Sequence, residues 1–167
     1  EARYSTPDWH RLTGGPDEFK YHTDQKGNLP LHLLLSRDDA VNVVREIQDY
    51  INSKKLNTIF DLFDINSFEL RNVDGKTPIS LIMQNESLTR VCFEPLLIKA
   101  DELYNSTGFR KILFTCTRFA LEYGNIELLE QCMNKIQKVH ENNKGKGYLA
   151  NPVEREVGFF LDYLVLR

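Results

Sequence analysis

Two hexapeptides, GNLPLH (Gly27–His32) and GKTPIS (Gly75–Ser80), decide how this chain is expected to fold. In each, a glycine precedes a proline by three positions, after polar turn-forming residues and before an apolar run. Glycine allows a turn backbone with positive φ, and proline pre-sets the first turn of a helix. Each hexapeptide therefore predicts a projecting turn, here named a finger, that leads directly into a helix.

The residues after the first hexapeptide predict a pair of helices. Residues 29–35, LPLHLLL, are short and apolar throughout, which is typical of a buried helix with Pro30 in its first turn. Residues 36–51 are expected to form a longer amphipathic helix, capped by Ser36 and Asp39. Its predicted apolar face consists of Val41, Val44, Ile47 and Ile51.

The same cycle recurs twice along the chain. Pro78 opens a second short apolar stretch, and Pro95 is expected near the start of the outer helix that follows. A third pass has two helices separated at Gly124. The apolar stripe of its second helix comprises Leu129, Met133, Ile136 and His140. Because one such unit cannot bury its own apolar face, neighbouring units must stack, and the chain is predicted to be mainly α without strands.

On these residues the sequence resembles the ankyrin-repeat family, whose pattern is roughly D-x-x-G-x-T-P-L-H-x-A-A-x-x-G. Residues 24–38 match it at Asp24, Gly27, Pro30, Leu31 and His32. Residues 72–86 match it at Gly75, Thr77 and Pro78. The third unit keeps Thr115, Ala120, Gly124 and Asn125, but TCTR replaces TPLH and Leu113 replaces the finger glycine.

The resemblance implies a short ankyrin-like solenoid of stacked helical hairpins with irregular, lengthened repeats. Pro30 and Pro78 lie 48 positions apart, and Pro78 and Cys116 lie 38 apart, against about 33 in a regular array. The extra residues fall in 52–70 and around Pro95. The predicted organisation is a lead-in (1–23), three repeats (24–71, 72–109 and 110–141), and a turn with a C-terminal capping helix (142–167). Another helical-hairpin solenoid is the alternative.

Composition limits the classes of partner. The chain has 167 residues, 21 Lys and Arg against 24 Asp and Glu, and a net charge of −3, so no strong positive field attracts nucleic acid or an anionic membrane. No apolar run has the length of a membrane span. The three cysteines, an odd number within apolar segments, indicate buried thiols in a reduced, intracellular protein. The sequence lacks an initial Met, which favours an excised fragment or a processed product.

No constellation of residues predicts catalysis, and we expect no catalytic, metal or cofactor site. The resemblance gives His32 a structural role, in which its imidazole bonds backbone groups between adjacent repeats. Cys116 paired with a histidine is the residual candidate for a nucleophile, but no orienting acid or oxyanion turn accompanies it. The sequence has no C-x-x-C, its four histidines are scattered, and Asp61 and Asp64 have the spacing of a solvated helix face.

Ankyrin-like proteins bind other proteins through their finger tips and the exposed side of their inner helices. In the first unit the matching positions are Gln25, Lys26, Asn28, Ser36 and Arg37. In the second unit they are Val73, Asp74, Lys76, Gln84 and Asn85. In the third unit only Glu122 and Tyr123 match. Val73 and Tyr123 are the expected anchors, because a plain solvated surface explains them least.

The leading hypothesis is thus an adaptor or scaffold that binds another protein and has no catalysis of its own. Degenerate repeats with long insertions are similar to ankyrin modules in host-directed effectors of intracellular bacteria and viruses, which would place the protein in the host cytoplasm. One alternative is the substrate-recognition region of a larger enzyme, and another is a thiol enzyme built on Cys116. The apolar helix expected over 153–167 packs on the third repeat or serves self-association.

Overall fold

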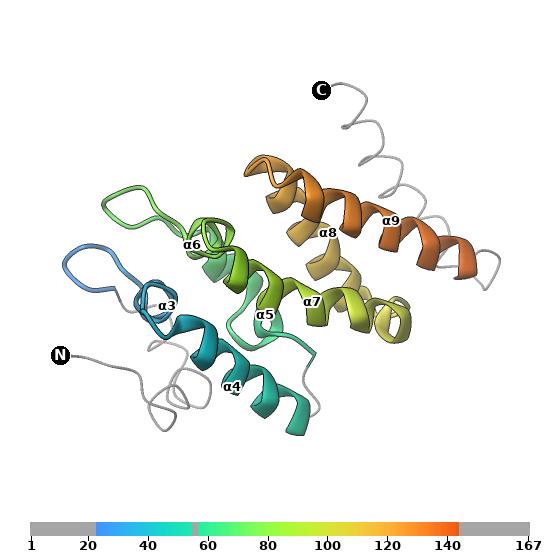
Figure 1. The fold of residues 1–167 in the computed structure, drawn as a ribbon, viewed down its shortest axis with the longest axis horizontal. Helices are drawn as coiled ribbons and strands as arrows, with labels where there is room; N and C mark the ends of the chain where they lie inside the picture. Colours follow the sequence, from blue (N-terminus) through green and yellow to red (C-terminus); the bar gives the residue numbers. More distant parts are fainter. Residues whose placement is uncertain (1–22, 55–56, 144–167) are drawn as a thin grey trace. The chain divides into compact units, whose positions relative to one another are not determined.

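The computed structural model describes residues 23–54 and 57–143, and these residues are helical without any strand (Figure 1). The prediction of a mainly α chain is therefore confirmed for this part of the sequence. The chain divides into two compact units, one ending at Leu96 and the other beginning at Leu97. Most of the predicted lead-in and the predicted helix over 153–167 lie outside the described residues.

The first unit combines short helices of four to six residues with longer ones. Its elements are α3 (Pro30–Leu35), α4 (Ala40–Ser53), α5 (Ile59–Leu62), the 3-10 helix η1 (Ile65–Glu69), α6 (Pro78–Met83) and the first part of α7 (Glu86–Leu103). The second unit contains the end of α7, α8 (Thr107–Glu122) and α9 (Ile126–Asn143).

The two short helices begin as the hexapeptides predict. Pro30 and Pro78 occupy the first turns of α3 and α6, where a helix needs no backbone donor. Gly27 and Gly75 have φ of 72° and 76°, the left-handed region that glycine adopts without steric cost. Each hexapeptide is thus a left-handed turn followed by a proline-started helix.

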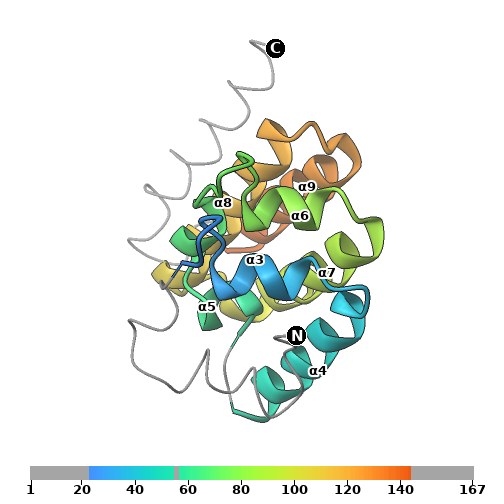
Figure 2. The same ribbon diagram turned by 90° about the vertical axis from the view of Figure 1, so that its left-hand side faces the viewer.

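The short helices α3 and α6 pack against each other, and α4 packs against α3 (Figure 2). On α4 the buried apolar face includes Val43, Val44, Ile47 and Ile51. Val41, which was predicted to lie in this face, is only half-buried, and the neighbouring Ala40 is buried there instead. The predicted cap was also wrong: Asp39 precedes α4, but its carboxylate binds the Arg37 guanidinium at 2.7 and 2.8 Å instead of capping the helix.

The long insertion between the fingers folds back into the core of the first unit. Phe60 lies 4.8 Å from Phe68 and 5.4 Å from Phe93 between ring centroids, and all three rings are buried. Asp61 and Asp64 do not form a solvated helix face, because Asp61 accepts a bond from the Thr58 amide and Asp64 accepts one from Asn66 as η1 begins. The extra residues therefore supply core side chains as well as loop length.

The helix α7 is longer than the sequence predicted. Pro95 lies inside α7, which begins at Glu86, so the expectation that proline marks the start of this helix was wrong. α8 and α9 pack against each other, and α8 is buried over most of its length. The two helices meet at Gly124, whose φ of 71° ends α8 where the sequence predicted a break.

Candidate protein-binding surface

The first finger (residues 24–28) is closed by the side chain of its first residue. The Asp24 carboxylate accepts bonds from the amides of Lys26 and Asn28, both at 2.9 Å, and Gly27 donates its amide to the Asp24 carbonyl at 3.0 Å. The donation from the Asn28 backbone holds the pKa of Asp24 below its ordinary value. These bonds hold a short polar loop in one conformation while its tip remains exposed.

The second finger (residues 72–76) repeats this arrangement with an amide in place of the carboxylate. Asn72 Oδ1 accepts from the amides of Asp74 at 3.0 Å and Lys76 at 2.9 Å. The Gly75 amide donates to the Asn72 carbonyl at 3.0 Å, and the Asn72 amide donates to the Lys76 carbonyl at 2.9 Å. Position by position, residues 72–76 correspond to residues 24–28.

Three hydrogen bonds join the two fingers. The Val73 amide donates to the Lys26 carbonyl at 2.9 Å, and Asn72 Nδ2 donates to Asn28 Oδ1 at 2.9 Å. The third runs from His32 Nε2 to the Lys76 carbonyl at 3.0 Å, while His32 Nδ1 accepts from the Leu29 amide at 2.9 Å. A neutral imidazole with its proton on Nε2 satisfies both contacts. The predicted bridging role of His32 is confirmed.

The joined fingers, here named the finger platform (residues 24–28 and 72–76), carry exposed side chains of mixed chemistry. Val73 is 68% exposed, the largest exposed fraction among the big apolar side chains of the described residues. Three exposed charged residues belong to the same platform. Asp74 follows Val73 directly, Lys76 ends the same finger, and the Lys26 carbonyl accepts the Val73 amide. An apolar side chain among charged ones on a backbone fixed by hydrogen bonds is typical of a recognition surface.

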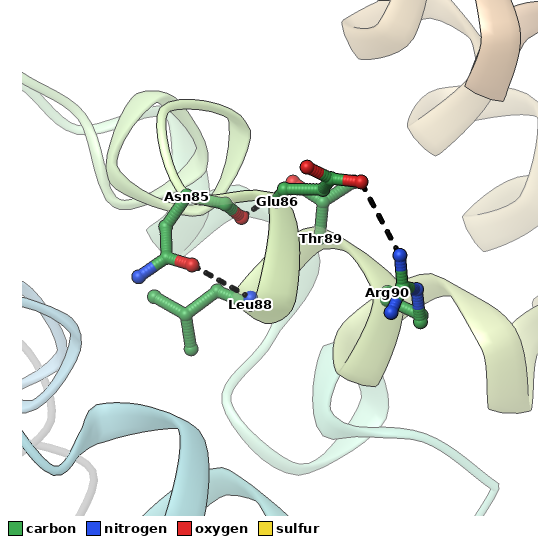
Figure 3. Close-up of polar contacts among 5 residues, drawn as sticks. All are labelled: Asn85, Glu86, Leu88, Thr89 and Arg90. Carbon is green, nitrogen blue, oxygen red and sulfur yellow. Dashed lines mark hydrogen bonds and ion pairs between the residues drawn. The ribbon is translucent and has the colours of Figure 1, made fainter.

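Other predicted binding residues lie at the far ends of the short helices, where the side chains of Ser36, Arg37 and Asn85 make bonds within the chain. Ser36 ends α3, and its hydroxyl donates to the His32 carbonyl at 2.7 Å. Arg37 is engaged by Asp39, and the exposed Gln84 ends α6. Figure 3 shows the Asn85 side chain turned toward the start of α7, where its oxygen accepts from the Leu88 amide at 3.1 Å.

The remaining two predicted residues belong to the second of the two compact units, which begins at Leu97. Glu122 ends α8 and lies within ion-pair distance, 3.7 Å, of Arg118. Tyr123 follows it and is 43% exposed, and the next apolar side chain, Ile126, is 58% exposed. The structure therefore brings together the predicted finger residues of the first unit, whereas Glu122 and Tyr123 lie in a separate unit.

Sequence reasoning missed Asn72, which organises the second finger and binds the first. Its signal was present, because Asn72 stands three positions before Gly75 as Asp24 stands three positions before Gly27. Asx side chains that accept backbone amides two residues ahead are a common way to close such turns. Leu70, 45% exposed just before this finger, was also missed.

The three cysteines occupy core positions. Among the described residues none of the three is in a disulfide, all are buried, and Cys116 is fully inaccessible. Burial raises the pKa of Cys92 to about 12, and it raises the pKa of Cys132 to about 12 despite a hydrogen bond between Cys132 and Thr117. A nucleophilic cysteine needs an accessible thiolate, and these environments disfavour it.

The described residues contain neither a cluster of metal ligands nor a helix that could span a membrane. In residues 23–54 and 57–143, no three His, Cys, Asp or Glu side chains gather in a way that would hold a metal ion. Within the same part of the chain, no helix combines the length and apolarity needed to cross a bilayer.

Comparison with known proteins gives no neighbour for this chain. No protein-family model matches it, and no curated protein and no solved structure matches it.

Proposed function

We propose that this chain is a protein–protein interaction module, a short and irregular ankyrin-like solenoid that acts as an adaptor or scaffold without catalysis of its own. The observation that carries the proposal is the finger platform: two projecting turns, joined by three hydrogen bonds, that present an exposed valine among charged side chains. The partner in this proposal is another intracellular protein. If the chain is an effector, this partner is in the cytoplasm of the host cell.

Three features support the ankyrin-like part of the proposal. The fingers share the same turn chemistry, α3 and α6 pack side by side, and His32 bonds one finger to the next as the resemblance requires. A platform already fixed by hydrogen bonds loses little conformational entropy on binding, so even a modest contact area yields useful affinity. Val73 is the anchor in this proposal, since desolvation of exposed apolar side chains contributes most at interface centres.

Affinity capture from a eukaryotic cell lysate tests the proposal with a matched pair of variants. Val73→Glu places a charge on the finger platform, while Ile98→Glu places the same charge on α7 at a side chain of similar exposure, 63% against 68%. Both variants should unfold at the temperature of the unchanged chain. We expect a specific partner to be lost with Val73→Glu and retained with Ile98→Glu. Equal capture by both variants would remove the finger platform as the binding site.

A further inference from the structure

The edge of the first finger is covered by the second finger, and this contact defines a pattern. The carbonyl of Lys26 accepts a backbone amide from Val73, and the side chain of Asn28 accepts from the side chain of Asn72. A finger edge thus binds two consecutive residues: the first through its side chain and the second through its backbone amide. Such pairing of an edge with an added main-chain segment is a common mode of peptide recognition.

The second finger has the same edge, and it is open. The positions that correspond to Lys26 and Asn28 are Asp74 and Lys76, and both are exposed. In the described part of the chain no donor reaches the Asp74 carbonyl, and the Lys76 ammonium pairs with no carboxylate.

The two finger glycines show the same contrast. A Cβ built on Gly27 would meet the backbone of Asn72 and Val73 at 3.4 Å, whereas a Cβ on Gly75 would meet nothing within 4 Å. A third finger that could cover this edge is missing from the described residues, because only three residues separate α7 (ending at Leu103) from α8 (beginning at Thr107). Within residues 23–54 and 57–96, which belong to the same unit, nothing covers this edge.

We propose that this open edge, residues 74–76, binds an extended segment of the partner protein in which an acidic residue is followed by a residue with a free backbone amide. The inference rests on the proposed function and specifies the chemistry of the partner. The amide donates to the Asp74 carbonyl, as Val73 does to Lys26 within the chain. The acidic side chain pairs with Lys76, because a cation stands where Asn28 accepts an amide in the covered edge.

One segment of the chain itself has the required pattern and supplies a probe. Asp24 is followed by Gln25, whose amide makes no hydrogen bond to the described residues. A cyclic peptide of sequence TDQKGN presents this pair in a closed turn. Two control peptides isolate the two contacts: one carries Asn in place of the acidic residue, and the other carries an N-methyl group on the following amide.

Titration of the isotope-labelled full chain with these peptides, followed by amide chemical shifts, tests the proposal. We expect TDQKGN to shift Asp74, Gly75 and Lys76 in the unchanged chain. Each control peptide, and Lys76→Glu in the chain, should weaken binding about threefold to tenfold, the loss expected for one hydrogen bond or charge pair. Binding that is unchanged by N-methylation, or shifts that avoid residues 74–76, would overturn the proposal.

Two outcomes separate this proposal from its alternatives. Concentration-dependent shifts at residues 74–76 without peptide would assign the edge to a second copy of the chain and overturn the assignment to a partner segment. If Val73→Glu abolishes capture of a cellular partner while Lys76→Glu leaves it intact, the proposed function stands and the edge proposal fails.

Discussion

The most informative perturbation of the finger platform is His32→Ala. The imidazole is 1% exposed, accepts from the Leu29 amide at 2.9 Å and contacts the Lys76 carbonyl at 3.0 Å. Each bond contributes about 0.5–1.5 kcal/mol net, and a buried donor left without an acceptor costs a further 1–3 kcal/mol or so. Together with the cavity left by the ring, the expected loss is about 3 kcal/mol, a large share of the 5–15 kcal/mol or so that stabilises a typical domain.

Ser80→Ala is the matched control, because Ser80 follows Pro78 by two positions as His32 follows Pro30. Its hydroxyl accepts from the Thr77 amide at 3.0 Å and donates to the Thr77 carbonyl at 2.7 Å, so both contacts stay within its own turn. We expect about 1 kcal/mol of destabilisation from Ser80→Ala. Only His32→Ala also loses a contact between the fingers.

Urea unfolding followed by circular dichroism measures the two losses, and native-state hydrogen exchange of the Val73 amide measures the coupling between the fingers. In the unchanged chain this amide donates to the Lys26 carbonyl and should be protected. His32→Ala should reduce this protection, and Ser80→Ala should leave it nearly unchanged. A loss below about 1 kcal/mol for His32→Ala, or unaltered exchange at Val73, would refute the reasoning that His32 joins the fingers.

Three further predictions concern stability away from the finger platform. Arg110→Met removes a buried guanidinium that donates to the Tyr104 carbonyl at 3.0 Å just after α7, and should cost about 2 kcal/mol in urea unfolding. Asn85→Ala removes the cap of α7 and should cost about 1 kcal/mol in the same assay. Because the pKa values of Cys92 and Cys132 are raised to about 12 from 9.0, stability should fall as the pH rises above about 9, where only the unfolded thiols ionise. At pH 8 a thiol reagent should label these cysteines only as fast as the chain unfolds, and rapid labelling would contradict the burial.

The parts of the fold that follow from local chemistry were predictable from the sequence. A left-handed turn needs Gly27 and Gly75, and a proline at a helix start needs no backbone donor, so both finger–helix junctions could be located in advance. The bridging role of His32 came from the family resemblance and was confirmed by its two contacts.

The parts that depend on competition between partners were not predictable. Asp39 stands where a helix cap is expected, but its carboxylate accepts two hydrogen bonds from the nearby Arg37 guanidinium. Such a charge-assisted, bidentate contact is stronger than a single bond to a backbone amide. Pro95 tolerates a helix interior because the surrounding packing of α7 outweighs one lost backbone bond, which a local rule cannot weigh.

The exposed residues of the finger platform were named in advance as candidates for binding, but the way in which the two fingers are held together was not. The family resemblance pointed to Lys26, Val73 and Lys76, whereas the hydrogen bonds that hold the two fingers together join residues more than forty positions apart. A recurrent signal was also overlooked: Asn85 and Asn125 each accept from the amide of a leucine three positions later, at the starts of α7 and α9.

Site-specific photo-crosslinking tests the central claim most directly. A photoreactive amino acid placed at Val73 on the finger platform, and in a second chain at Ile98 on α7, samples two side chains of similar exposure in the same cells. We expect a discrete crosslinked protein from position 73 that is absent from position 98. The same crosslinks from both positions, or a discrete product from position 98 alone, would contradict the claim that the finger platform is the recognition surface.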